Sequence, residues 1–484
     1  MDLLDRIDDW AARAPDRTAH RSGGRILSYA ELRAQSNALA ARLWSTLPDD
    51  GSPVAVIGHK EPEMLVAFLA CAKAGHPYVP IDTAMPPMRV ARIVELAAAS
   101  LSLTAETIAE WTAGPRERPP RQRSPGDAHY IMFTSGTTGD PKGVVITAEC
   151  LDTFLAWIEG EHGFRAGETF LNQTTFSFDL SVMEVWVALA TGATIVSLTR
   201  AELDDARRLF DTLSGSGATT WISTPSFAQL CLVERTFGQA MMPRLERMLF
   251  CGEILPPAVA SALLERFPTA EVWNTYGPTE ATVACSSIRI DRALIERYAA
   301  LPIGYPMRPG GMMVVDREGC PVPEGESGEL VIVGPNVSTG YFRRPDLTNR
   351  AFFAWDGQRA YRTGDRGRVQ DRLFFCEGRL DRQVKVHGFR IELGDVEAHL
   401  CALPGVREAV VLPELHDGIP VGLLAVVVPD GPAPARAFQA AAELRARLAE
   451  RLPRHMLPRR IRFVSAFPMT PNGKIDRRRV AELV

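Results

Sequence analysis

A short apolar run that ends in a loop of Thr, Ser and Gly and closes on a lysine occupies residues 130–143, YIMFTSGTTGDPKG. Residues 130–133 have the types of a buried strand, and such a loop after a strand offers backbone N–H groups and hydroxyls to an anion. Lys142 would add a positive charge. A Walker A loop needs Gly-Lys-Ser/Thr before a helix, whereas Lys142 lies between Pro141 and Gly143. The residues therefore predict a phosphate-binding loop of another kind, with a plain turn as the alternative.

A second motif, NTYGPTEAT, spans residues 274–282 and combines an aromatic ring, a Gly-Pro turn and an acid. The ring of Tyr276 can stack on a purine. Glu280 can hold magnesium on phosphate oxygens, because Mg²⁺ takes one or two carboxylates together with phosphates. The alternative is a surface turn with a solvated acid.

A third cluster joins YRTGDRGR at residues 361–368 to EGRLDRQVKVHGFRIEL at 377–393. The carboxylate of Asp365 suits a ribose diol, because it can accept hydrogen bonds from both hydroxyls. Arg379 can meet phosphate or ribose oxygens. A charged surface hairpin is the alternative interpretation.

Lysine is scarce in this chain: only five of the 54 basic residues are lysines. A lysine kept among arginines indicates a place that needs a compact ammonium. Lys142 lies in the loop described above, and Lys474 lies in PNGKIDRRR, where the alternative is a solvated turn residue. Lys60 and Lys73 flank an apolar helix, and their side chains are expected to extend to solvent.

Length and composition limit the class of protein. A chain of 484 residues is too long for one core, so two or more domains are expected. A net charge of −4 gives no basic field for nucleic acid, and no apolar run approaches a membrane span. The eight cysteines show no CxxC or paired spacing, which predicts neither a zinc site nor disulfides. We therefore expect a cytoplasmic protein with no membrane insertion and no nucleic-acid partner.

The elements that must position these residues alternate in type. A helix starting at Ser28, a strand at 53–58, a helix at 63–75 and a strand at 78–81 predict βαβ units and a largely parallel sheet. Beyond about residue 300, short strands with Gly and Pro turns predict an antiparallel or barrel-like part. The last hundred residues have a small α/β pattern. We place the boundary at Asp381, which gives domains 1–380 and 381–484.

These motifs, in this order, resemble those of the adenylate-forming enzyme superfamily, whose members activate carboxylic acids with ATP. The resemblance spans nearly the whole chain. It implies an α/β fold with a large N-terminal domain of parallel α/β sheets, a small barrel-like part, and a small mobile C-terminal domain that turns about a hinge at Asp381. It also implies ATP and Mg²⁺ as cofactors, with Glu280 as the metal ligand and Lys474 bridging the substrate carboxylate and the α-phosphate.

The resemblance assigns further residues one by one. In members that activate amino acids, the residue matching Asp179 binds the α-ammonium, and a buried aspartate among apolar neighbours needs such a cation. The positions implied for the nucleotide are Thr134, Ser135, Gly136, Thr137, Thr138, Gly139, Lys142, Asn274, Thr275, Tyr276, Gly277, Pro278, Thr279, Asp365, Glu377, Gly378, Arg379 and Lys474. Those implied for the amino acid are Asp179, Leu180, Met183, Ser223, Leu249, Cys251, Thr275, Val283, Ala284 and Lys474.

The apolar residues of this pocket predict a substrate with a small apolar side chain. By resemblance, the chain is expected to activate D-alanine or another small amino acid to an aminoacyl-AMP and transfer it to the phosphopantetheine thiol of a carrier protein. One alternative is a freestanding enzyme that loads L-alanine or a similar residue in nonribosomal peptide or polyketide biosynthesis. The others are a small-acid acyl-CoA synthetase and a non-catalytic nucleotide-binding protein.

Overall fold

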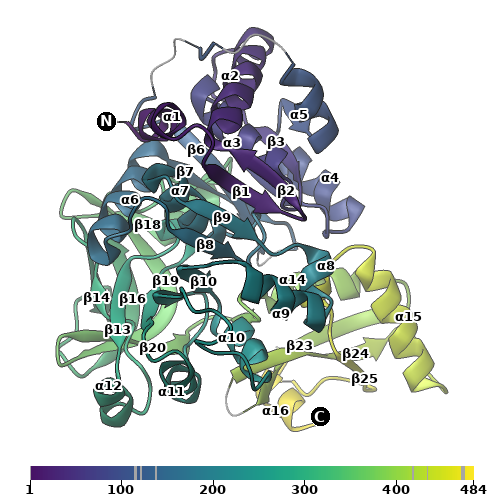
Figure 1. Cartoon of the computed structure of the whole chain (residues 1–484). Helices are drawn as coiled ribbons and strands as arrows, with labels where there is room; N and C mark the ends of the chain where they lie inside the picture. The colour runs from purple at the N-terminus through teal and green to yellow at the C-terminus, as the bar shows by residue number, and fades with distance from the viewer. Residues whose placement is uncertain are drawn as a thin grey trace. The chain divides into compact units, whose positions relative to one another are not determined.

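The computed structural model describes residues 2–113, 117–119, 123–136, 139–416, 419–432, 434–469 and 475–483 (Figure 1). Contacts divide the chain into two compact units. Unit 1 comprises Met1–Asp82, Val94–Phe133 and Gly143–Leu380, and unit 2 comprises Thr83–Ile93, Thr134–Lys142 and Asp381–Val484. The sequence predicts a single boundary at Asp381; in the structure a segment of unit 2 also begins there, joined by two short segments from earlier in the chain.

The largest sheet within the described residues has nine strands and belongs to unit 1. Its central strands are parallel, as the alternation of strands and helices predicts. Antiparallel strands complete both edges. In spatial order the strands are β14 (Tyr305–Pro306), β13 (Ser286–Ile290), β12 (Glu271–Tyr276), β11 (Arg247–Phe250), β10 (Thr220–Ser223), β8 (Thr169–Asn172), β9 (Thr194–Ser197), β1 (Thr18–Ser22) and β2 (Arg25–Ser28).

Two further sheets complete the strands of this part of the chain. The first is mainly parallel, in the order β17 (Gly340–Tyr341), β7 (Lys142–Thr147), β6 (Ala128–Thr134), β4 (Tyr78–Asp82), β3 (Val54–Gly58) and β5 (Leu101–Leu103). The second is antiparallel, as predicted beyond residue 300, in the order β15 (Gly311–Val315), β16 (Ser327–Val333), β19 (Gln358–Gln370) and β18 (Phe352–Trp355), with β20 (Leu373–Arg379) paired to β19.

Helices enclose the parallel sheets. Helix α7 (Leu180–Thr191) is buried at every position, and apart from Ser181, Glu184 and Thr191 its sequence is apolar. Helix α2 (Tyr29–Thr46) begins at the predicted N-cap Ser28, which forms a capping box with Glu31. The other helices before Asp381 are α1 (Leu3–Arg13), α3 (Pro62–Ala74), α4 (Pro87–Leu96), α5 (Ala105–Trp111), α6 (Ala148–His162), α8 (Arg200–Leu203), α9 (Ala206–Gly215), α10 (Pro225–Leu232), α11 (Pro257–Arg266), η1 (Thr279–Ala281), α12 (Arg292–Arg297) and α13 (Pro345–Ala351). Most of α4 belongs to unit 2.

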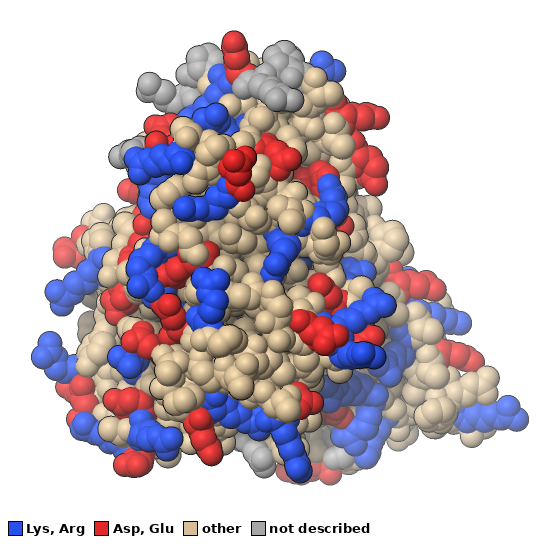
Figure 2. Space-filling view, in the orientation of Figure 1, with Lys and Arg blue, Asp and Glu red and all other residues tan. Residues whose placement is uncertain are grey.

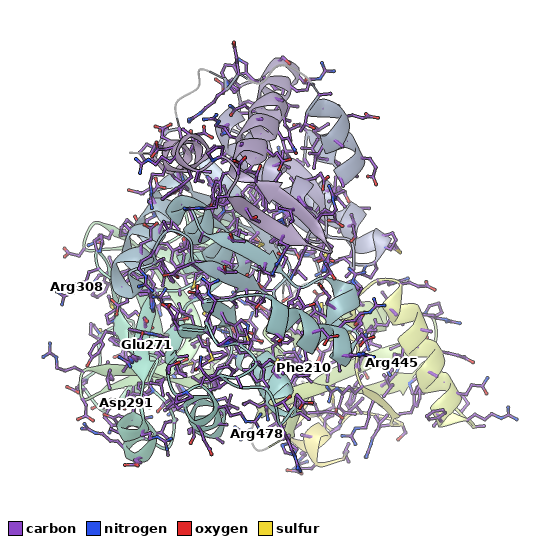
Figure 3. The ribbon with its side chains drawn as sticks, in the orientation of Figure 1. Phe210, Glu271, Asp291, Arg308, Arg445 and Arg478 are labelled. Atoms are coloured by element: carbon purple, nitrogen blue, oxygen red, sulfur yellow. The ribbon has the colours of Figure 1, made fainter. Side chains whose placement is uncertain are left out.

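The C-terminal part of unit 2 has a small α/β core of its own. Its strands are β21 (Gln383–Val386) with β22 (Phe389–Glu392), and β23 (Val406–His416), β24 (Ile419–Pro429) and β25 (Arg460–Phe463). Its helices are α14 (Leu393–Cys401), α15 (Ala437–Ala449), η2 (Arg454–Met456) and α16 (Arg477–Glu482). Arg445 of α15 and Arg478 of α16 point away from the ribbon (Figure 3).

The prediction for two of the lysines is wrong. Lys60 and Lys73 are each only 1% exposed, so neither side chain extends to solvent. Lys73 Nζ is 2.7 Å from Asp8 Oδ1, and this carboxylate compensates part of the cost of burying its charge. On the face shown in Figure 2, basic and acidic side chains are interspersed. No helix among the described residues is long and apolar enough to cross a membrane.

Candidate active site

The predicted site residues of unit 1 gather at the carboxyl edge of its parallel strands. Phe250 at the end of β11 lies opposite Ser223 of β10 and Asn274 of β12, so the segments that follow these strands leave the sheet side by side. Ligands of open parallel sheets bind at this edge. The predicted residues at or just beyond these strand ends are Ser223, Leu249, Cys251, Asn274, Thr275 and Tyr276. Asp179 follows β8, the strand that pairs with β10 on its other side.

Most of the residues predicted for the amino-acid pocket belong to one hydrophobic cluster and are at most 3% exposed. They are Leu180, Met183, Leu249, Cys251, Val283 and Ala284. Two polar residues of the predicted pocket are also buried. Thr275 donates a hydrogen bond to the carbonyl of Phe250 at 3.0 Å, and Ser223 donates one to Oε1 of Gln173 at 3.4 Å. The structure therefore brings these residues together around a largely apolar wall.

Asp179 supplies the charged group next to this wall. It is the N-cap residue of α7 and only 7% exposed, yet its carboxylate does not cap its own helix. At the start of α9, by contrast, Asp205 accepts from the backbone N–H groups of Arg207 and Arg208 at 2.9 and 3.2 Å. The positive end of the α7 dipole favours a carboxylate charge at this place. A buried carboxylate charge is stabilised by a cation, and the α-ammonium of an amino acid is such a cation.

Three residues predicted for the nucleotide bond to one another. Tyr276, at the end of β12, donates its hydroxyl to Oδ2 of Asp365 at 2.6 Å. Arg379, at the end of β20, donates to Oδ1 of the same carboxylate at 2.8 Å and to the carbonyl of Thr363 at 2.8 Å. Burial, and then the charge of Asp365, hold the pKa of Tyr276 well above its usual value, so the phenol stays a donor. A carboxylate has about four acceptor sites, so Asp365 can still accept from ribose hydroxyls.

The hydrogen bond from Tyr276 to Asp365 can be removed by a single substitution. Tyr276→Phe removes the hydroxyl and keeps the ring, so we expect the KM for ATP to rise roughly 10- to 100-fold, because a hydrogen bond to a charged group contributes about 1.5–3 kcal/mol. The KM for the amino acid should stay within about twofold. Initial rates of pyrophosphate exchange at varied ATP measure the change.

The chain contains a matched control for this substitution. Tyr298 donates its hydroxyl to Oδ2 of Asp371, also at 2.6 Å, but neither residue belongs to the predicted site. Tyr298→Phe should therefore leave the KM for ATP unchanged. Equal effects of the two substitutions would contradict a nucleotide role for Tyr276.

The acid predicted to hold magnesium is fully buried. Glu280 lies in η1 and accepts a hydrogen bond from the Tyr341 hydroxyl at 2.7 Å. A carboxylate oxygen is the hard donor that Mg²⁺ takes together with phosphate oxygens, so this residue fits such an ion. Thr282 and Val283, just after η1, have φ values of 56° and 68°, and for a β-branched residue this is a strained conformation.

The turn around Glu280 is held by its neighbours. Pro278 is the N-cap of η1, and Thr279 is its first residue. A Cβ atom at Gly277 would lie 2.5 Å from Cα of Ala284, so only glycine fits there. Asn336 donates to the carbonyl of Ala281 at 3.0 Å and accepts on its own carbonyl from Thr282 at 2.7 Å. The strained backbone is therefore fixed from both sides.

The predicted phosphate loop lies in unit 2, between Thr134 at the end of β6 and Lys142 at the start of β7. Ser135 donates its hydroxyl to the carbonyl of Arg390 at 2.7 Å and accepts from the N–H of Glu392 at 3.2 Å. Both partners belong to β22. Gly136 and Gly139 are required by the backbone, the first because a Cβ would lie 2.1 Å from the carbonyl oxygen of Asp140 and the second because its φ is 92°.

The remaining predicted residues have other partners or lie outside the described residues. Glu377 of β20 accepts from Ser327 at 2.7 Å and pairs with Arg366 at 3.3 Å, so its nucleotide role stays a prediction, as does that of Gly378, whose φ is 115°. Asp381 accepts from the N–H of Gln383 at 3.1 Å. Asn274 donates to the carbonyl of Pro302 at 2.7 Å. The residues outside the described ranges are Thr137, Thr138 and Lys474.

Sequence reasoning missed the residues that support the site. Gln173 contacts Ser223, Tyr341 contacts Glu280, and Asn336 holds the turn around it. No local pattern marks these residues, because their partners lie 50, 61 and 55 positions away in the chain. The one available signal was the closeness of Gln173 in the chain to the predicted ligand Asp179.

Solved structures share this fold. The artificially fused Adenylation-PCP di-domain NRPS, NpsA-ThdA from Klebsiella oxytoca, matches with a TM-score of 0.84 at 26% identity over 95% of this chain and 93% of that chain. The AlmE adenylation domain from Vibrio cholerae matches with a TM-score of 0.85 over 99% of this chain and 98% of that chain, and at 20% identity this likeness concerns the fold alone. The fold is that of adenylation domains, which confirms the predicted fold class.

The family follows from the sequence matches. The family described as AMP-binding enzyme matches residues 7–342, and the AMP-binding enzyme C-terminal domain matches residues 395–474. This chain belongs to the AMP-binding enzyme family. A protein of Bacillus cereus (strain B4264) named D-alanine--D-alanyl carrier protein ligase is 43% identical over 502 aligned residues, covering 99% of both chains. The resemblance inferred from the motifs is confirmed.

Proposed function

We propose that this protein is an AMP-forming ligase that activates D-alanine with ATP and transfers it to the phosphopantetheine thiol of a carrier protein. The observation that carries the proposal is the buried carboxylate of Asp179, which directly precedes Leu180 in a wall of small and medium apolar side chains. An amino acid with a short side chain satisfies both parts of this site. The full-length likeness to proteins named D-alanine--D-alanyl carrier protein ligase supports the same substrate.

The proposed chemistry has two steps. In the first, a carboxylate oxygen of D-alanine attacks the α-phosphorus of ATP, an O–P bond forms, and the bond to pyrophosphate breaks. In the second, the thiol sulfur attacks the acyl carbon of D-alanyl-AMP; a C–S bond forms, the C–O bond to AMP breaks, and the thiol proton is released. Both steps depend on positioning and charge rather than on a covalent protein nucleophile.

Each predicted site residue has one role in the proposed reaction. Asp179 binds the substrate ammonium, Asp365 and Arg379 orient the ribose, and the loop from Thr134 to Lys142 holds the phosphates. Lys474 stabilises the charge that develops between the carboxylate and the α-phosphate. Glu280 would hold Mg²⁺, which supplies neutralisation of the phosphate charge when it is bound. Asp381 would be the hinge about which the C-terminal part turns between the two steps.

The proposal is tested by pyrophosphate exchange with D-alanine, L-alanine, glycine and serine at equal concentrations. D-Alanine should give the highest kcat/KM. A clear preference for L-alanine, glycine or serine would instead favour a freestanding enzyme that loads another small amino acid in a biosynthetic pathway. Discrimination among these substrates involves about 1–3 kcal/mol of packing, which is a 10- to 200-fold range that the assay resolves.

The second step needs its own acceptor test. A phosphopantetheinylated carrier protein should accept the D-alanyl group from the enzyme and ATP, whereas free coenzyme A should be a poor acceptor. Efficient thioester formation on coenzyme A alone would make the chain an acyl-CoA synthetase. Because the reaction consumes ATP, we propose the cytoplasm as its location.

A further inference from the structure

Lys60 and Lys73 are both buried, but their ammonium groups contact different kinds of partner. Lys73 Nζ donates to side chains only: Oδ1 of Asp8, Oγ of Ser36 and Oδ1 of Asn37, at 2.7, 3.0 and 2.7 Å. Lys60 Nζ instead donates to backbone carbonyls. An ammonium group that donates to backbone carbonyls holds that part of the backbone in place. The role of Lys60 therefore depends on which segment these carbonyls belong to.

The carbonyls that Lys60 contacts belong to Asn172 at 3.2 Å and Gln173 at 2.8 Å. These residues end β8 and begin the connection to Asp179 at the start of α7. The side chain of Gln173 in turn accepts from Ser223 at 3.4 Å. Lys60 therefore forms hydrogen bonds directly to the connection that leads to Asp179. Through Gln173, a second hydrogen bond links it to Ser223, a polar residue of the predicted pocket.

A second buried titratable group, Glu184, holds the same connection. Glu184 of α7 is fully buried and accepts from the side chains of Asn172 and Thr174, the latter at 3.1 Å. Asn172 also donates to the carbonyl of Thr174 at 3.0 Å. Burial lowers the pKa of Lys60 to about 8 and raises the pKa of Glu184 to about 8, and the charge of each group acts against the shift of the other. Lys60 is therefore largely protonated at pH 7.

We infer that Lys60 is a positioning residue for the amino-acid substrate, because its ammonium fixes the backbone of Asn172 and Gln173 and thereby the connection that presents Asp179 to the pocket. The inference rests on the proposed function, since it takes Asp179 as the ligand of the substrate ammonium. Lys60 touches neither substrate nor nucleotide in this scheme. Its removal should affect amino-acid binding selectively.

The test compares Lys60→Met with Lys73→Met in the full-length protein. In Lys60→Met the KM for D-alanine should rise roughly tenfold in pyrophosphate exchange, since the hydrogen bonds lost involve a charged group. The KM for ATP and kcat should stay within about twofold. Lys73→Met removes an equally buried lysine at the other end of α3, so it should lower Tm without changing the KM for D-alanine. An unchanged KM for D-alanine in Lys60→Met, or an equal rise in both variants, would overturn the inference.

A second variant keeps the test decisive if Lys60→Met does not fold. Lys60→Met removes the positive charge that opposes the raised pKa of Glu184, so the ionised form of this buried acid becomes more costly. In Lys60→Met/Glu184→Gln the acid is gone, so the fold should recover while the KM for D-alanine stays raised. If neither variant folds, Lys60 serves folding and the inference fails.

Failure of the proposed function gives a different pattern. If the unmodified protein prefers another amino acid, the same comparison is made with that amino acid. A selective rise in its KM would uphold the positioning role although D-alanine is rejected. If the unmodified protein exchanges pyrophosphate with no amino acid, both the proposed function and the inference fall.

Discussion

Lys474→Ala is expected to reduce D-alanine-dependent pyrophosphate exchange at least about 10²-fold while ATP binding changes little. A preorganised charge aimed at the place where charge develops contributes on this scale to the transition state, and it contributes much less to the ground state. The ammonium of lysine is a compact point charge, which suits a position between a carboxylate and a phosphate. Exchange kinetics give the rate, and equilibrium binding of ATP measures the affinity separately.

Arg478 provides the control for this substitution. It lies four positions along the chain from Lys474, is exposed, and points away from α16 (Figure 3). Arg478→Ala removes one positive charge from the same segment, so it should leave the exchange rate within about twofold. If Lys474→Ala retained the full exchange rate, or lost activity only through weaker ATP binding, the catalytic assignment of Lys474 would be wrong.

Asp179→Ala is the second substitution with a large expected effect. Without the carboxylate, the α-ammonium of D-alanine would be buried without a partner, and sites built around such a polar contact discriminate by roughly 10⁴-fold. We therefore expect kcat/KM for D-alanine to fall on this scale and the preference for D-alanine over propionate to disappear. Adenylate formation with each acid, measured under the same conditions, checks both parts.

The N-cap position of Asp179 requires a control for helix stability. Asp205 is the N-cap of α9 and does bond to its own helix, so Asp205→Ala should cost about 0.5–2 kcal/mol of stability. It should leave the preference for D-alanine intact. If Asp179→Ala destabilised the fold as Asp205→Ala does and still preferred D-alanine over propionate, Asp179 would be a structural cap and the pocket assignment would fail.

The elements that carry the site could be predicted because their signals are local. The strand at 53–58 and the helix at 63–75 correspond to β3 and α3, and Ser28 caps α2 as predicted. Each of these depends on periodicity or capping within a few residues. The same holds for the antiparallel strands beyond residue 300, whose Gly and Pro turns mark their ends.

The contacts within the site could not be predicted, because they join distant positions. Tyr276 and Asp365 are 89 residues apart, and neither motif indicates that the other completes it. The burial of Lys60 escaped prediction for a related reason: the carbonyls that bind it lie more than a hundred residues further along the chain. A lysine beside an apolar helix has the same local sequence whether it extends to solvent or is buried by a distant segment.

The strained turn after η1 limits which side of the predicted amino-acid pocket can change during evolution. Val283 owes its position to a left-handed backbone that Gly277 and Asn336 enclose, so a new side chain there must also keep an unfavourable conformation. Met183 and Leu180 lie on a regular helix, where a larger or smaller apolar residue needs no change of backbone. Relatives of this enzyme with other substrate preferences should therefore differ in the apolar side chains of α7. The residues of the turn should be the same in relatives that differ in substrate.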